Sequence, residues 1–86
     1  MSLLRIPRYL ELTGGSRSKL YADVAAGLMV KPVKLGPRMV AIPSEEADAI
    51  VAARTGGATD EQVRALVRNL HAKRAKAAQA VLQQVA

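Results

Sequence analysis

The 86-residue sequence contains no cysteine, phenylalanine or tryptophan, and Tyr9 and Tyr21 are its only aromatic residues. The absence of cysteine excludes disulfides and thiolate metal sites and fits a reducing cytoplasm. Without large rings, the core must be built from aliphatic side chains. No apolar run reaches the roughly 20 residues that cross a bilayer, and no cleavable signal is visible. We therefore expect a soluble cytoplasmic protein with no membrane partner.

Positive charge is in clear excess. Thirteen Lys and Arg face seven Asp and Glu, which gives a formal charge of +6 and a pI near 10.3. This balance is the electrostatic footprint of a nucleic-acid binder, although a basic protein that is merely soluble has it too. A chain of this size buries only about 60% of its unfolded surface, which leaves no room for a deep substrate cleft.

Two short helices are predicted near the N-terminus. The first opens at Ile6-Pro7, because proline tolerates the first helical position, and stops near Gly14. Ser16 is a good N-cap for the second helix, which Gly27 ends. The residues expected to face the core, at helical spacing, are Ile6, Tyr9, Leu10, Leu20, Val24 and Leu28.

The pattern then changes to a hairpin and a third helix. Apolar residues at 33–35 and 39–42 flank a turn at Gly36-Pro37, which predicts two short strands. Ser44 is expected to cap the third helix, whose early acidic residues suit the positive end of its dipole. Those residues are Glu45, Glu46 and Asp48, and Ala47, Ile50 and Val51 are expected to form its apolar stripe.

The last third of the chain reads as a linker and a long helix. Residues 55–58 include Gly56-Gly57, and Thr59 with Gln62 forms a capping-box signature. We expect a mainly α fold with a small β-hairpin: a winged helix-turn-helix domain over 1–54, a Gly-rich hinge at 55–58, and a C-terminal helix over 59–86. This helix either packs on its own domain or serves self-association, so a chain ending after Gly57 is expected to fold.

The start of the second helix is the strongest candidate for DNA contact. A helix-turn-helix reads DNA with the N-terminal residues of its second helix, in the major groove. Here those residues are Ser16, Arg17, Ser18, Lys19 and Tyr21. Arg17 and Lys19 can reach guanine edges or phosphates, and the serines can bond either group. Tyr21 either offers its hydroxyl to a phosphate or is a partly buried ring.

The hairpin adds a second cationic element. Lys34 and Arg38 lie on either side of the Gly36-Pro37 tip, where they would follow a neighbouring minor groove, although exposed hairpin cations are also ordinary solvated surface. Arg5 and Lys31 are weaker phosphate candidates. Because the second helix otherwise presents alanines, base reading should be sparse, which favours selection by DNA shape.

Catalysis and metal binding have little support. Ser16 and Ser18 have no nearby base, and the spacing from Gly14 to Lys19 does not match a phosphate-binding P-loop. His71 is the single histidine, so a metal site is not expected. The basic run from His71 to Lys76 favours a solvated helix face over a phosphate site. We predict no enzyme activity, no cofactor and no metal.

Two blocks of the sequence, within about residues 6–54, resemble the AlpA-type phage regulators and excisionases, a branch of the MerR-like winged helix-turn-helix proteins. The blocks are Leu12-Thr13-Gly14 followed by Ser16-Arg17-Ser18-Lys19-Leu20-Tyr21, and Lys31-Pro32-Val33-Lys34-Leu35-Gly36-Pro37-Arg38. In that family the second helix enters the major groove and the wing tracks the minor groove. The resemblance therefore implies DNA-contact roles for Ser16, Arg17, Ser18, Lys19, Tyr21, Lys34 and Arg38.

Members that act as excisionases, or recombination directionality factors, bind side by side near phage attachment sites and bend the DNA. The integrase of the phage then excises the prophage in the bacterial host. The resemblance implies such a DNA-bending role, with cooperative binding to tandem double-stranded sites. A transcription regulator of the same family is the first alternative. A protein-interaction module that does not bind DNA is the second.

Overall fold

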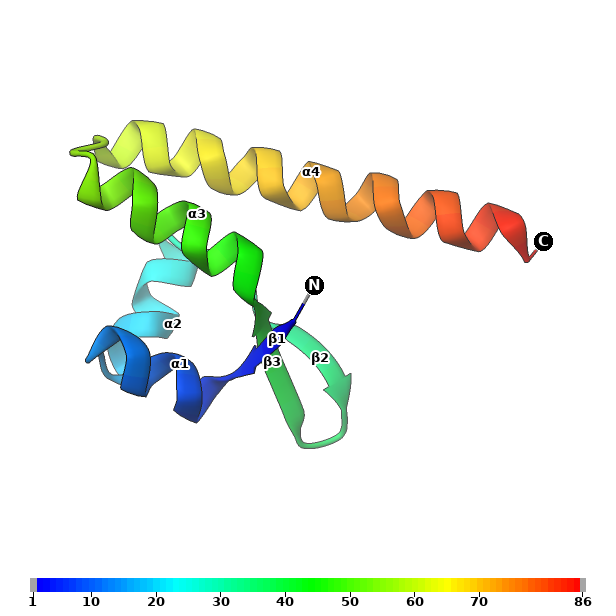
Figure 1. The fold of residues 1–86 in the computed structure, drawn as a ribbon, viewed down its shortest axis with the longest axis horizontal. Helices are drawn as coiled ribbons and strands as arrows, with labels where there is room; N and C mark the ends of the chain where they lie inside the picture. The colour runs from blue at the N-terminus through cyan, green and yellow to red at the C-terminus, as the bar shows by residue number, and fades with distance from the viewer. Residues whose placement is uncertain (1, 86) are drawn as a thin grey trace.

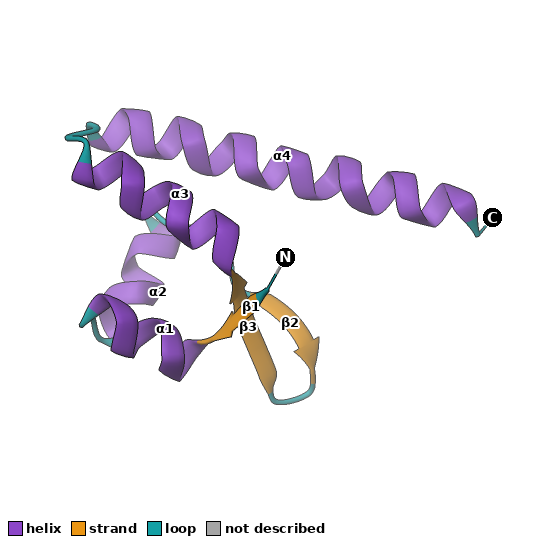
Figure 2. Cartoon of the chain, viewed as in Figure 1, coloured by secondary structure: helices purple, strands orange, loops and turns teal. Residues whose placement is uncertain are grey.

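The computed structural model describes residues 2–85 (Figures 1 and 2). Its main-chain path confirms the expectation of a mainly helical protein with a small hairpin. A third strand joins the hairpin into a small antiparallel sheet. In chain order, the elements are β1 (Leu3–Arg5), α1 (Ile6–Thr13), α2 (Arg17–Ala25), β2 (Val33–Gly36), β3 (Met39–Pro43), α3 (Ser44–Thr55) and α4 (Asp60–Gln84).

Local signals explain the first two helices. Gly14 follows α1 with a φ of 70°, a left-handed conformation that suits glycine. Ser16 caps α2 as predicted, because its side chain accepts a hydrogen bond from the backbone N–H of Lys19 at 3.1 Å. Gly27, with a φ of 77°, follows the last turn of α2. The turn between α1 and α2 is therefore specified by residues close together in sequence.

The sheet has the strand order β1-β3-β2, and both pairings are antiparallel. The hairpin lies where it was predicted, with a register irregularity between Lys34 and Gly36 that marks a bulge. Strand β1 was not predicted. Leu3 pairs with Pro43 and Arg5 with Ala41, so its existence depends on a partner about 40 residues away.

The predicted cap of α3 is wrong. Pro43 is the N-cap residue, and the helix begins at Ser44. No side chain forms a capping hydrogen bond at this end of the helix. Instead, the Ser44 hydroxyl donates to the Ser2 carbonyl oxygen at 3.1 Å, and the Ser44 N–H donates to the same oxygen at 2.9 Å. The pairing of β1 with β3 brings Ser2 to this position, so a tertiary contact replaces the local cap.

The connection between α3 and α4 is a tight turn that reverses the chain. Gly57 has a φ of 86°, and the N–H of Ala58 donates to the Ala53 carbonyl oxygen at 3.0 Å. Thr59 and Gln62 form the predicted capping box at the start of α4. As a result, α4 runs back alongside α3 (Figure 1).

The core is aliphatic, as expected, but it includes the first half of α4. Val63 and Val67 are buried in the same cluster as Leu20, Val30 and Ile42. Of the two alternatives for the C-terminal helix, packing on its own domain is therefore the one that its first half adopts, and a chain ending after Gly57 would lose these buried side chains. Val51 also departs from the predicted stripe of α3, because it is half-exposed. The C-terminal end of α4 projects beyond the rest of the molecule (Figure 1).

Candidate nucleic-acid interface

The first turn of α2 combines exposed polar side chains with a free helix N-terminus. Ser16, Arg17, Ser18 and Lys19 are all exposed. The Ser16 side chain uses its acceptor on the Lys19 N–H, while the N–H groups of Arg17 and Ser18 precede the first intrahelical bonds. Those N–H groups and the helix dipole favour an anion at this position.

Lys19 and Tyr21, two of the α2 residues predicted to contact DNA, differ in how free their side chains are to bind a partner. Lys19 donates to Asp23 at 2.7 Å, an i,i+4 ion pair that partly offsets its charge, so Arg17 is the stronger cation of this helix. Tyr21 is 44% exposed and does not belong to the hydrophobic core cluster.

The hairpin presents both charge and apolar surface near its tip. Pro37 and Arg38 form the turn between the paired residues Gly36 and Met39, and Lys34 is exposed on β2. Leu35 and Met39 are 46% and 43% exposed, respectively. An unburied leucine and methionine beside two cations is a surface suited to a partner that has both phosphates and apolar edges.

Ion pairing separates the basic residues into two groups. Arg8, Lys19, Arg54, Arg64 and Arg74 each form an ion pair with a carboxylate. Within residues 2–85, the cations without such a partner are Arg5, Arg17, Lys31, Lys34, Arg38, Arg68, Lys73 and Lys76. The unpaired group contains five of the cations predicted to contact DNA: Arg5, Arg17, Lys31, Lys34 and Arg38. Lys19 is paired, and so is Arg8, the weakest of the phosphate candidates.

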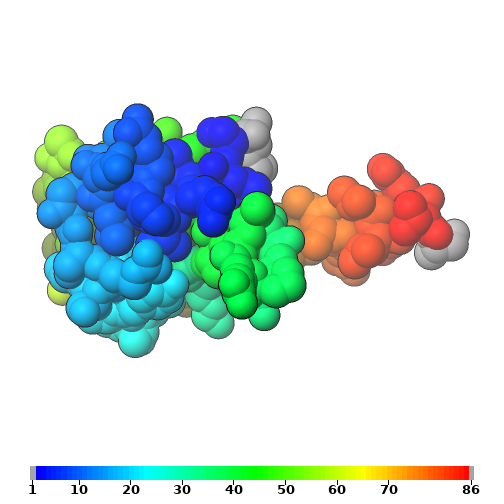
Figure 3. Space-filling model, turned by 90° about the horizontal axis from the view of Figure 1, so that it is seen from below, coloured from blue at the N-terminus to red at the C-terminus, as the bar shows by residue number. Residues whose placement is uncertain are grey.

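The elements that carry these predicted residues share one face of the molecule. Figure 3 views this face, with α1 in blue, α2 in cyan and the hairpin in green side by side, and with the end of α4 projecting past them. The first half of α4 lies on the opposite side (Figure 1). The structure therefore brings together the segments that contain Arg17, Lys34 and Arg38.

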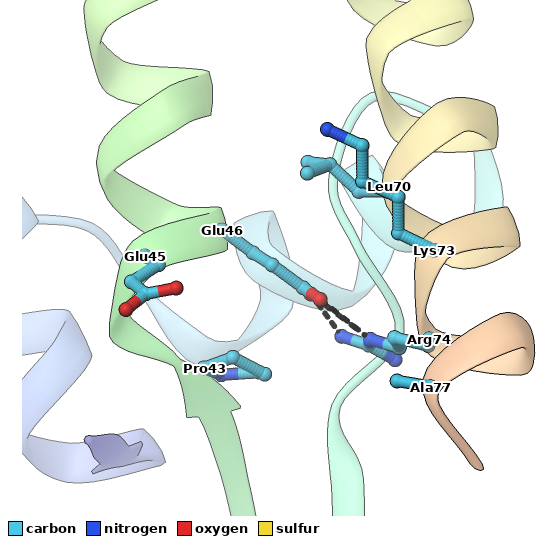
Figure 4. A pocket seen from close by; sticks show the side chains of 7 residues that line it. All are labelled: Pro43, Glu45, Glu46, Leu70, Lys73, Arg74 and Ala77. Atoms are coloured by element: carbon cyan, nitrogen blue, oxygen red, sulfur yellow. Dashed lines mark hydrogen bonds and ion pairs between the residues drawn. The ribbon is translucent and has the colours of Figure 1, made fainter. Parts of the chain in front are cut away.

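The sequence favoured a solvated helix face for the basic run from His71 to Lys76. The structure shows that part of this run makes contacts within the protein. Arg74 donates two hydrogen bonds from Nε to the Glu46 carboxylate, at 3.0 and 2.9 Å, and a further bond from its terminal nitrogen. Figure 4 shows this pair at a pocket of about 290 Å³ between α3 and α4; Glu45 also lines the pocket, but the dashed lines join Arg74 to Glu46 alone. Lys73 and Lys76 remain exposed.

Two further α4 side chains hold the segment that joins α2 to β2. Arg64 Nε donates to the Ala26 carbonyl oxygen at 3.0 Å, and His71 Nε2 accepts the Lys31 N–H at 3.1 Å. Partial burial, followed by the charges of Arg74 and Lys31, lowers the pKa of His71 below its ordinary value of 6.5. The negative charge of Glu46 opposes this shift.

Sequence reasoning missed Arg64, His71 and Arg74 as structural contacts. Each partner is distant along the chain, so no local motif marks these pairs. The only available signal was their position on the helix: Arg64, His71 and Arg74 recur at intervals of seven and three residues, which places them near one face.

Tyr9 links α1 to the segment after α2. Its hydroxyl donates to the Met29 sulfur at 3.6 Å. Burial is the main reason that the pKa of Tyr9 lies above its ordinary value of 10.0; nearby Asp23 raises it further, and Lys19 opposes the shift. This contact stabilises the connection and is not part of the exposed surface.

Among residues 2–85, the structure shows neither a metal-binding cluster nor a membrane-spanning helix. No group of three or more histidine and carboxylate side chains is placed to hold a metal ion. None of the helices described has the length and apolar character that a bilayer crossing requires. Comparisons with protein-family models, curated proteins and solved structures found no significant match to this chain.

Proposed function

We propose that this protein is a winged helix-turn-helix excisionase, a small protein that binds and bends double-stranded DNA and directs an integrase toward prophage excision. In this proposal α2 is the recognition helix and the β2–β3 hairpin is the wing. Two observations carry it: α2 and the hairpin, the elements that contain Arg17, Lys34 and Arg38, lie side by side in Figure 3, and these three cations have no ion-pair partner among residues 2–85.

The roles of the individual residues follow from their chemistry. Arg17 stands at the start of α2, where it can reach a base edge, and the N–H groups there suit a phosphate. Lys34 and Arg38 lie in the hairpin, where their side chains would follow a minor groove, which attracts arginine where it narrows. Arg5 and Lys31 are exposed on β1 and on the segment before β2, and they add phosphate contacts.

The apolar tip of the hairpin supports bending. Proteins that bend DNA from the minor groove often insert leucine or methionine between base steps. Leu35 and Met39 are exposed, and they are the sequence neighbours of Lys34 and Arg38. Cations that neutralise phosphates, together with apolar side chains that contact the exposed bases, would favour a bent duplex.

The end of α4 supports self-association along DNA. Val81, Leu82 and Val85 are 61%, 65% and 78% exposed, and no charged residue lies between Ala77 and Val85. An uncharged segment is suited to contact between copies of a chain whose net charge is +6, because it adds no further repulsion. Adjacent copies on tandem sites would then bind cooperatively.

Bending is the property that tests the proposal most directly. In a circular-permutation gel shift on the DNA that flanks the nearest integrase gene, the complex should migrate differently as the site moves along the fragment. An integrase assay on the same DNA should shift from integration products to excision products when the protein is added. Unbent complexes and unchanged recombination products would remove the proposal.

The assigned surface is tested by substitution. Arg17→Ala should weaken binding by about 1–3 kcal/mol and alter the sequence preference, because a base contact is lost. Arg38→Ala should weaken binding more evenly across sequences. Arg68→Ala is the matched control, since it removes the same charge from the exposed surface of α4. If all three variants bind alike, the contact surface has been assigned wrongly.

A transcription regulator of the same fold is the second candidate, and the exposed end of α4 favours it if that end joins two copies as a dimer. A regulator should alter transcription from an adjacent promoter and leave the integrase products unchanged. A protein-interaction module would use the same helix end without DNA. With about four phosphate contacts, a DNA binder should show a log–log salt slope near −4, whereas such a module should have little affinity for duplex DNA.

A further inference from the structure

Three side chains of α4 bond to segments that adjoin the elements of the proposed DNA surface. Arg64 bonds the carbonyl oxygen of Ala26, which is the C-cap residue of α2. His71 accepts the N–H of Lys31, two residues before β2 begins. Arg74 forms a hydrogen-bonded ion pair with Glu46, which lies in the first turn of α3; this helix begins directly after β3.

These anchors leave little freedom between α2 and the hairpin. One end of the connecting segment is held at Ala26 and the other at Lys31, and between them Met29 and Val30 are buried in the core. The strand that enters the hairpin and the helix that leaves it are therefore both attached to the same stretch of α4. Because Arg64 and His71 are about two helical turns apart, a rigid helix sets the distance between their two partners.

We propose that α4 is a brace that holds α2 and the hairpin in their DNA-binding arrangement, with Arg64, His71 and Arg74 as positioning residues. This inference rests on the proposed function. It assigns α4 a role in DNA affinity although the first half of this helix lies on the side opposite the proposed DNA surface. It also makes that affinity depend on the protonation state of one residue.

His71 is the part of the brace that responds to pH. Its Nε2 accepts a hydrogen bond, so the ring is neutral with its proton on Nδ1. Protonation turns Nε2 into a donor that faces the Lys31 N–H, and the bond is lost. The charged groups around the ring are Arg74 on its own helix, Lys31 on the connecting segment and Glu46 on α3. The two cations disfavour the protonated form.

The direction in which DNA affinity changes on acidification distinguishes the brace from a direct effect of the added charge on DNA binding. Protonation of His71 adds one positive charge, which by itself strengthens binding to a polyanion. Loss of the bond between Lys31 and His71, in contrast, frees the segment that leads into the hairpin. This change should weaken binding, because α2 and the hairpin would no longer be held in position to reach the duplex together. His71 is the only histidine in the chain, so a matched variant isolates its contribution.

The experiment measures affinity for a short fluorescein-labelled duplex by anisotropy, at constant salt, between about pH 7.5 and pH 5.5. For the full chain we expect a loss of about two- to tenfold on acidification, the value of one hydrogen bond. His71→Gln keeps an acceptor that cannot be protonated, so it should bind like the parent at pH 7.5 and lose less affinity on acidification. His71→Ala has no acceptor for the Lys31 N–H, so it should bind weakly both at pH 7.5 and at pH 5.5.

A charge-matched pair tests the other anchor. Arg64→Gln and Arg68→Gln each remove one positive charge from α4, but only Arg64 bonds the end of α2. The brace predicts a greater loss of affinity for Arg64→Gln, with circular dichroism confirming that each variant is folded at the assay temperature. If Arg64→Gln does not fold, the comparison of the parent with His71→Gln still decides the inference.

Three results would overturn it. Affinity that rises or stays constant on acidification, while DNA binding at pH 7.5 is retained, overturns the brace alone. The same holds if His71→Gln shows the same pH profile as the parent. A parent that does not bind the duplex at pH 7.5 overturns the proposed function, and the brace is overturned with it.

Discussion

The two halves of α4 both carry large apolar residues at helical spacing, Val63, Leu66, Val67 and Leu70 in the first and Val81, Leu82 and Val85 at the end of the second, but their surroundings differ. From Asp60 to Arg74 the helix contributes Val63 and Val67 to the core and places three side chains on other elements. From Ala75 onward its residues are exposed, including Val81 and Leu82. The comparison shows that an apolar stripe predicts a face to be covered but not what covers it.

Truncation gives the largest expected contrast between the two halves. A chain ending after Thr59 loses two buried valines and the partly buried Leu66 and Leu70. At about 1.5–3 kcal/mol for each fully buried side chain, the loss is comparable to the whole stability of a small domain. Thermal melts followed by circular dichroism should show no cooperative transition for this chain. A chain ending after Lys76 should retain one.

A cooperative transition in the shorter chain would show that α4 is dispensable for folding. It would restore the view that residues 55–58 separate an independent domain from an appended helix. The result would also weaken the brace, because a helix that contributes little to the core would not hold other elements in position.

The next contrast uses the same substitution on both halves. Val67→Ala removes buried methyl groups and should cost about 1.5–3 kcal/mol of unfolding free energy. Val81→Ala, further along the helix and 61% exposed, should change stability by no more than about 0.5 kcal/mol. Urea titrations of the two variants measure both values. Equal effects would mean that the C-terminal half is buried in solution by a partner or a second copy.

The ion pair between α3 and α4 should make a smaller contribution. Glu46→Gln leaves the Arg74 guanidinium without its carboxylate in a partly exposed site, so we expect a loss of about 1–2 kcal/mol. Glu45→Gln is the matched control, because it removes the same charge from the same helical turn. The difference between the two variants isolates the contact with Arg74, and no difference would exclude a stabilising role for it.

The smallest expected effect is the pH dependence of stability. Because the pKa of His71 is lowered in the folded protein, the unfolded chain binds the proton more readily. The free energy of unfolding should therefore be constant above the ordinary pKa of 6.5 and fall as the pH drops below it. Urea titrations at several pH values should show this decline for the parent and less of it for His71→Gln. Parallel curves would exclude His71 as the cause.

The local structure of the segments that carry the candidate residues was largely predictable, because these residues are consecutive or separated by a tight turn. Ser16 caps α2, and Arg17 and Ser18 follow it directly, while Lys34 and Arg38 belong to one hairpin. The pairing of Lys19 with Asp23 was not anticipated, although an i,i+4 spacing is a local signal. The DNA-contact roles themselves remain predictions that the proposed binding experiments test.

The sequence by itself determined the ends of the elements: Gly14 and Gly27 close helices, Thr59 with Gln62 opens one, and a hairpin turns after Gly36. These signals act within a few residues, so their hydrogen bonds form wherever the segment lies. Only the tertiary structure decided the pairing of β1, the partner of Ser44, the contacts of Arg64, His71 and Arg74, and the buried half of α4. The hydrogen bonds among these contacts join residues at least 28 positions apart, and their geometry exists only when the whole chain has folded.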